Sequence, residues 1–254
     1  MRAEWTKLRT QASTSWLLLA AAALTIAVSA AAAAATRCPA GGCPEDPARI
    51  SLTGIYLGQA VVAVLAVMAV SGEYGTGMIR LTLAAMPRRT TVLAAKAVVL
   101  TGLVLVTGTL AVLASLLAGR LILPGHGIGP AHGYPVLSLG DGPVLRAALG
   151  SVLYLALIAL LSVGGAAALR EAAAAIGVVL GLLYLFPIIG AAAGRPDLAR
   201  HIQQIGPMTA GLAIQATTGL NHLPISPWAG LGVLAAWAAG ALLTGGLLLR
   251  LRDA

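Results

Sequence analysis

The stretch VLRAALGSVLYLALIALLSVGGAAAL, residues 144–169, carries a single charged side chain, that of Arg146. Leu, Ala, Val and Gly make up most of it. A transmembrane helix needs roughly 20 mostly apolar residues to cross the hydrocarbon core of a bilayer. Because this stretch exceeds that length, it predicts a membrane-spanning helix.

Five further apolar runs meet the same length criterion, and they cover residues 16–36, 52–70, 91–123, 172–193 and 228–249. Transmembrane strands are shorter, about 10 residues, and alternate in polarity, so a closed barrel is excluded. The first run is longer than the 7–15 apolar residues of a signal peptide, and we expect a retained helix. The sequence predicts an all-α membrane protein with six transmembrane helices, forming a single domain over residues 1–254.

The composition agrees with this fold class. Hydrophobic residues make up 59% of the chain and charged residues 9%, with a mean hydropathy of +0.92. Soluble globular domains carry about 25% charged residues, so a water-soluble fold is excluded. The net charge of +8 is assigned to membrane topology and lipid contact rather than to nucleic acid.

The distribution of Lys and Arg predicts the orientation, because these residues are retained on the cytoplasmic side. Six helices place both termini on one side. That side would hold ten of the 16 basic residues, namely Arg2, Lys7, Arg9, Arg80, Arg88, Arg89, Lys96, Arg170, Arg250 and Arg252. The other side would hold Arg37, Arg49, Arg120, Arg146, Arg195 and Arg200. We therefore expect both termini in the cytoplasm.

No enzymatic motif is present in the sequence. The strings GxSxG, HExxH and GxxxxGK[ST] are absent, which excludes a seryl hydrolase elbow, a zinc protease helix and a Walker A loop. Cys38 and Cys43 lie on the predicted outer side, where a disulfide is permitted, although two free thiols are the alternative. With no other Cys and no His nearby, a metal site is not expected there.

The charged segment 71–90, SGEYGTGMIRLTLAAMPRRT, separates the second and third predicted helices. Residues 72–77 predict a flexible corner. Residues 78–86 predict a short amphipathic helix that lies along the inner membrane surface and ends at Pro87. Lys96 is expected to extend from the third helix to the headgroups. An ordinary positively charged connector is the alternative interpretation.

Three stretches resemble permease subunits of type-2 ABC transporters, the exporter-like ABC-2 group common in high-GC Gram-positive bacteria. They are MRAEWTKLRTQASTSW (1–16), GEYGTGMIRLTLAAMPRRTTVLAAKAVV (72–99) and SPWAGLGVLAAWAAGALLTGGLLLRLRDA (226–254). In that family, residues 1–15 correspond to an amphipathic interfacial helix and residues 71–90 to a cytoplasmic elbow that docks on an ATPase.

The resemblance implies two six-helix permeases, identical or related, paired with two separate ATPase subunits in a bacterial plasma membrane. ATP and Mg²⁺ would bind to the ATPase, and this chain would bind no cofactor. The residues implied in coupling are Glu73, Tyr74, Thr76, Met78, Arg80, Arg88 and Arg89 of the elbow, with Glu4 and Lys7 of the N-terminal segment.

Two features suggest where a substrate passes. Gly54/Gly58 and Gly177/Gly181 have the small-xxx-small spacing that lets helices approach closely in lipid. The family places these helices near the interface between permeases, and packing inside one bundle is the alternative. Gln59, Tyr184 and Phe186 are candidate pathway residues, because polar and aromatic groups at membrane depth need a partner or a cavity.

The segment 194–227 is interrupted by Pro and Gly yet too apolar for a simple loop, and it predicts short outer or re-entrant helices. Two other functions stay open beside the transport subunit. A transporter not driven by ATP would usually carry acidic groups within its helices, whereas the acidic residues here fall at or beyond the predicted helix ends. A stand-alone membrane scaffold or immunity-type protein is the other alternative.

Overall fold

The computed structural model describes residues 12–37, 46–75, 89–129 and 137–251. Its six long helices are α2 (Ala12–Ala35), α4 (Ile55–Gly75), α6 (Arg89–Ile122), α7 (Gly142–Leu169), α8 (Ala172–Ala192) and α11 (Pro227–Leu251). Each contains a segment long and apolar enough to cross a membrane. The described residues contain helices and no strand, which confirms the all-α membrane fold with six candidate spans.

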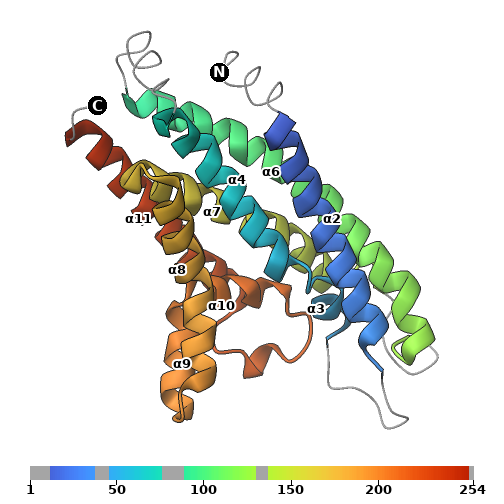
Figure 1. Ribbon diagram of the computed structural model, residues 1–254. Coiled ribbons are helices and arrows are strands. Elements are labelled where there is room, and N and C mark those ends of the chain that lie inside the picture. Colours follow the sequence, from blue (N-terminus) through green and yellow to red (C-terminus); the bar gives the residue numbers. More distant parts are fainter. Residues whose placement is uncertain (1–11, 38–45, 76–88, 130–136, 252–254) are drawn as a thin grey trace.

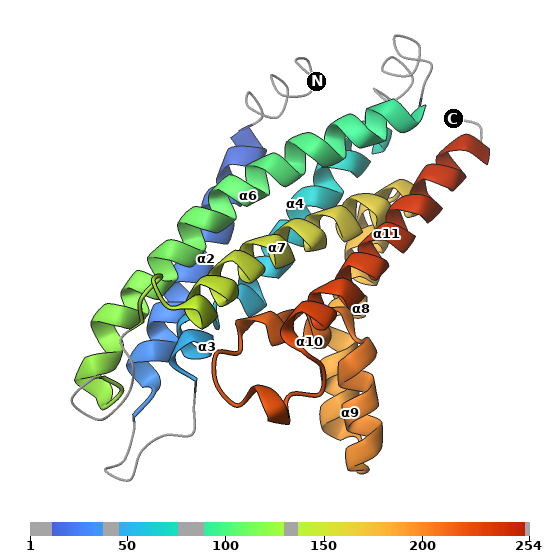
Figure 2. The same ribbon diagram turned by 180° about the vertical axis from the view of Figure 1, so that it is seen from behind.

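The helices form one elongated bundle (Figures 1 and 2). The start of α2, the end of α4, the start of α6 and the end of α11 lie at the same end, which we call the terminal end. The short helices α3 (Pro47–Ser51) and α10 (Pro207–Gly211) mark the opposite end, called the α10 end. This arrangement follows from an even number of spans joined in sequence.

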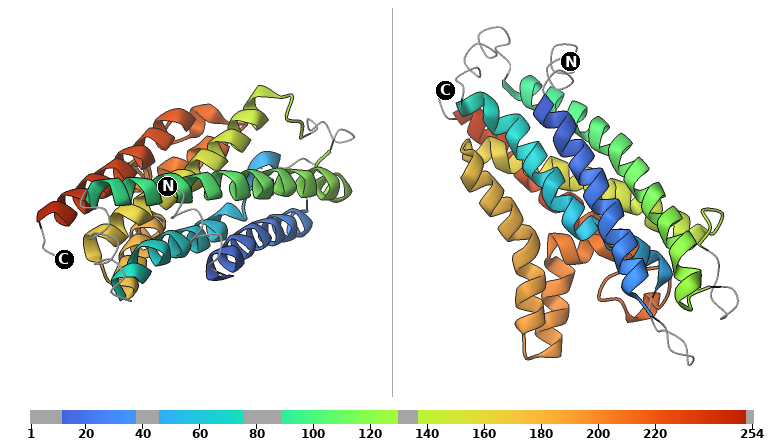
Figure 3. Two further views of the ribbon diagram at one scale, coloured as in Figure 1. Left: turned by 90° about the horizontal axis from the view of Figure 1, so that it is seen from above. Right: turned by 45° about the vertical axis from the view of Figure 1, so that its right-hand side comes forward.

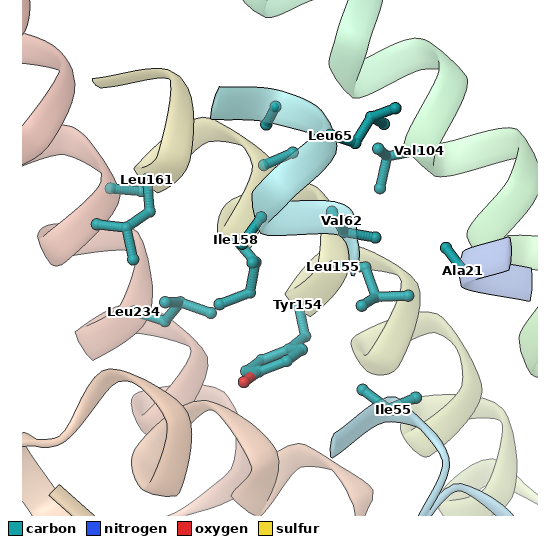
Figure 4. Close-up of a cluster of buried hydrophobic side chains, with 14 of the residues drawn as sticks. Ala21, Ile55, Val62, Leu65, Val104, Tyr154, Leu155, Ile158, Leu161 and Leu234 are labelled. Carbon is teal, nitrogen blue, oxygen red and sulfur yellow. The ribbon is translucent and has the colours of Figure 1, made fainter. Parts of the chain in front are cut away.

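Helix α7 occupies the centre of the bundle and packs against α4, α6, α8 and α11. Its buried side chains include Tyr154, Leu155 and Ile158, which meet Ile55 of α4 and Leu234 of α11 in the main hydrophobic core (Figure 4). Helix α7 is therefore the most enclosed of the six candidate spans.

Helix α2 packs tightly on α4 through glycine. A Cβ atom at Gly54 would lie 1.8 Å from the backbone oxygen of Thr25, and one at Gly58 would lie 2.0 Å from Thr25 Oγ1. For this pair the alternative interpretation, close packing inside one bundle, is confirmed. Gly177 and Gly181 of α8 have the same spacing, but a Cβ there would meet no atom within 4 Å.

The segment before the last span contains α9 (Pro196–Ile205), α10, and the 3-10 helices η3 (Leu212–Gln215) and η4 (Leu220–His222). Helix α9 runs beside α8 (Figure 3, right), whereas α10 and η3 return into the bundle with Met208, Ala210 and Ile214 buried. The expectation of short helices before the last span is thus confirmed.

Two local expectations differ from the structure at the terminal end. Helix α4 stays helical to Gly75, beyond the predicted boundary at residue 70. The expectation that Lys96 extends to the headgroups is wrong, since its side chain is only 5% exposed and Nζ donates to the backbone oxygen of Ala69 at 3.2 Å. Helix α6 begins at Arg89, so Lys96 lies two turns inside it, facing α4.

Candidate functional site

A cluster of polar side chains joins four helices inside the apolar bundle. The Tyr154 hydroxyl of α7 donates to Oε1 of Gln59 on α4. Gln59 Nε2 donates to the backbone oxygen of Tyr56 at 3.2 Å and to Sδ of Met208 on α10 at 3.1 Å. The Tyr184 hydroxyl of α8 donates to the same Tyr56 oxygen. These five residues are called the polar junction.

The polar junction satisfies groups that would otherwise be costly at membrane depth. Gln59 and Tyr154 are both fully buried, and Tyr154 is surrounded by Ile55, Ile158 and Leu234 (Figure 4). An amide or hydroxyl without a partner in such surroundings costs roughly 1–3 kcal/mol. The junction therefore specifies how α4, α7, α8 and α10 meet, and parting these helices requires exchanging its hydrogen bonds.

The three predicted pathway residues make different contacts in the structure. Gln59 and Tyr184 converge on the Tyr56 carbonyl, whereas Phe186 contacts Trp237 of α11 edge to face, with ring centroids 6.2 Å apart. Two positions along a helix rotate a side chain by about 200°, so Tyr184 and Phe186 face opposite ways. The assignment of all three to a substrate pathway stays a prediction.

An apolar groove of about 740 Å³ lies between α8 and α11, with α7 as its floor. Its polar lining groups are bonded to the protein: Trp237 Nε1 donates to Ile205 O at 3.0 Å, and Gln204 Nε2 donates to Pro224 O at 2.7 Å. Thr244 Oγ1 likewise donates to Gly240 O. An occupant of this groove would therefore meet an apolar surface.

A buried carboxylate ties two distant segments together at the α10 end. Asp46 caps α3 by accepting from Ala48 N at 3.0 Å. It also accepts from Thr217 N and from Thr217 Oγ1 at 2.6 Å, and from Thr218 N at 3.0 Å. The sequence showed Asp46 only as an acidic loop residue, because its partners lie 171 and 172 positions away.

The residues implied in coupling fall mostly outside the described residues. This holds for Glu4, Lys7, Thr76, Met78, Arg80 and Arg88. Glu73 and Tyr74 belong to the last turn of α4, and Arg89 begins α6. Cys38 and Cys43 also lie outside the described part. The coupling role and the disulfide stay predictions.

The described residues contain no group of three or more His, Cys, Asp or Glu side chains that could hold a metal ion. The polar junction consists of amide, hydroxyl, thioether and backbone groups that join four helices.

Comparison with known proteins agrees with this architecture. The family model described as ABC-2 family transporter protein matches residues 1–188. The match contains α2, α4, α6 and α7, most of α8, and the segment between α4 and α6. None of the curated proteins compared with the chain matches it. With a family model covering well over half of its length and six apolar helices of spanning length, the chain belongs to the ABC-2 family of membrane transporter proteins.

Proposed function

We propose that this chain is the permease subunit of an ABC exporter, forming the substrate pathway and driven by a separate ATPase through the elbow at residues 71–90. Permeases of the ABC-2 family generally work with ABC ATPases. The chain has no Walker A loop of its own, so ATP hydrolysis belongs to the partner. The terminal end lies on the cytoplasmic side of a bacterial plasma membrane, in keeping with the excess of basic residues predicted there.

The observation that carries this proposal is the continuity of α4. One unbroken helix runs from Ile55 to Gly75, with the polar junction near its start and the first residues of the elbow, 71–75, at its end. Gln59 and Gly75 are separated by about 24 Å at the helical rise of 1.5 Å per residue. Helix α4 is thus a rod that joins the proposed ATPase contact to the interior of the bundle.

Two contacts of α4 would transmit a movement of the elbow to the other helices of the bundle. Lys96 Nζ bonds to Ala69 O and so links α6 to α4 on the membrane side of the elbow. At the other end of the rod, Gln59 is bonded to α7 and α10. ATP drives transport only if its binding favours one arrangement of these helices over another. The polar junction supplies discrete hydrogen bonds that such a change would exchange.

Charge reversal in the elbow tests the coupling. In the complex purified with its ATPase, Arg88→Glu with Arg89→Glu is expected to lower permease-dependent ATP hydrolysis at least tenfold, because a cationic contact becomes repulsive. The matched control is Arg49→Glu with Arg120→Glu, two exposed arginines at the α10 end, which should leave the rate within twofold. Carbonate extraction of membranes checks that every variant is inserted.

Two results would contradict the coupling proposal. One is an unchanged rate of ATP hydrolysis in the elbow variant. The other is purification of the wild-type chain from its native host without any ATP-hydrolysing partner, which would favour the scaffold or immunity-type alternative.

A second permease is proposed to pack on the exposed face of α8. Gly177 and Gly181 leave open space on this face, and Val178, Leu185 and Ile188 are exposed beside them. In lipid, paired small residues allow two helix backbones to approach closely. The same spacing at Gly54 and Gly58 is already used inside the bundle, so α8 is the face left available.

Larger side chains on α8 test this proposed dimer interface. Gly177→Leu with Gly181→Leu is expected to lower the dimeric fraction in nanodiscs at least tenfold, as measured by mass photometry, because the new side chains hold the backbones apart. Gly232→Leu is the control, since Gly232 of α11 is also exposed with no neighbour within 4 Å. An equal loss in both variants, or a loss in neither, would refute an α8 interface.

A further inference from the structure

A second apolar groove, of about 610 Å³, lies between α6 and α11 at the terminal end. Figures 1 and 2 show the start of α6 approaching the end of α11 there. Val98 on α6 and Leu243 and Leu247 on α11 line it and are 56%, 74% and 57% exposed. The groove therefore faces the surroundings of the bundle, which in a membrane are lipid.

Small residues keep this groove open. A Cβ atom at Gly246 would meet only Leu93 Cδ2, at 4.0 Å, and Ala94 and Ala97 line the α6 side. Along α11 the lining extends from Leu242 to Arg250, a rise of about 12 Å. One leaflet of the hydrocarbon core is about 15 Å thick, half of the whole core. The groove thus has the length of a single acyl chain within one leaflet.

A cation stands at one end of the apolar lining. Arg250 lies in the last turn of α11, where the apolar span ends, and it is the charged residue lining the groove. Its side chain is exposed, and no hydrogen bond or ion pair joins its guanidinium group to another residue that the structure describes. A guanidinium group binds phosphate oxygens in a bidentate manner.

We propose that this groove binds one anionic phospholipid, with an acyl chain against Gly246 and the phosphate on Arg250. Basic pockets between transmembrane helices select anionic headgroups. A zwitterionic phospholipid carries its own cation beside the phosphate, which competes with Arg250, whereas phosphatidylglycerol carries none. The site is independent of the coupling proposal, because it requires only that the terminal end reaches a membrane surface.

Native mass spectrometry of the delipidated full chain, titrated with phosphatidylglycerol or phosphatidylcholine, tests the proposal. The wild-type chain is expected to bind its first phosphatidylglycerol about fivefold more tightly than its first phosphatidylcholine, since one basic residue near the surface contributes about a factor of that size. Arg250→Gln should abolish this preference while leaving phosphatidylcholine binding unchanged. Gly246→Leu fills the groove and should weaken the binding of both lipids.

The matched control is Arg120→Gln, which removes an exposed arginine from the last turn of α6 at the α10 end. It should retain the full preference for phosphatidylglycerol. Equal affinities in the wild-type chain, or the same loss in Arg120→Gln as in Arg250→Gln, would overturn the proposal. Dimers that dissociate in Gly246→Leu would also overturn it, because the groove would then belong to a protein interface. A thermal scan of each variant verifies that it remains folded.

Discussion

Gly164→Ala is expected to lower the free energy of unfolding by about 3 kcal/mol, an overpacking cost at the upper end of the usual range. A Cβ atom at Gly164 of α7 would lie 2.4 Å from the carbonyl carbon of Ala241 and 2.5 Å from Leu242 N on α11. These are backbone atoms, so no side chain can rotate away, and the two helices must separate. Unfolding by SDS titration in mixed micelles measures the change.

The same crossing is tight from the other side, where a Cβ at Gly245 would lie 2.5 Å from Gly164 O. Gly232→Ala on α11 is the matched control, because a Cβ there meets no atom within 4 Å. Alanine favours helix over glycine by up to about 1 kcal/mol, so this control should be neutral or slightly stabilising. If Gly164→Ala is as stable as Gly232→Ala, the close α7–α11 crossing is refuted.

The polar junction is expected to show strong coupling between Gln59 and Tyr154. Tyr154→Phe removes the hydroxyl that donates to Gln59 Oε1, and the buried acceptor left behind should cost roughly 1–3 kcal/mol. Gln59→Leu leaves the Tyr154 hydroxyl in apolar surroundings at a similar cost. The double variant should lose less than the sum of the two, by about 1 kcal/mol. Equilibrium unfolding of the four proteins gives this coupling energy.

Tyr184→Phe provides the control for the same chemical change. The Tyr184 hydroxyl donates to the backbone oxygen of Tyr56, which also accepts from Gln59 Nε2. The oxygen therefore keeps a side-chain partner, and we expect a cost under about 1 kcal/mol. Additive losses for Gln59 and Tyr154 would show that the hydrogen bond between them contributes nothing measurable.

The spans could be predicted because an apolar run of sufficient length has few alternatives in a bilayer. The run at residues 144–169 differs from α7 only at its start, which lies at Gly142. The end of α4 was predicted too early, at residue 70, because Gly72 and Gly75 are typical of turns. Once a helix is formed, each added residue gains a hydrogen bond for little further cost, so it continues through such residues.

The site was predicted less completely, because its contacts depend on topology. Gln59 was identifiable as an amide within an apolar run, but its partners Tyr154 and Met208 lie 95 and 149 residues away. Gly54/Gly58 and Gly177/Gly181 share one sequence pattern and have opposite surroundings. The spacing of two glycines predicts that another helix can approach this helix closely. Which helix does so depends on how all the helices pack, and the sequence pattern does not contain that information.

At the α10 end, the Asp46 carboxylate holds the segment at residues 217–218 more firmly than α9 is held. Lifting residues 217–218 away from α3 would break three hydrogen bonds to one buried acid. Helix α9 has no buried residue and is held to the chain after α10 by two side-chain hydrogen bonds, from Gln204 Nε2 to Pro224 O and from Trp237 Nε1 to Ile205 O. Residues 217–218 are therefore expected to stay with α3 when the helices at this end rearrange.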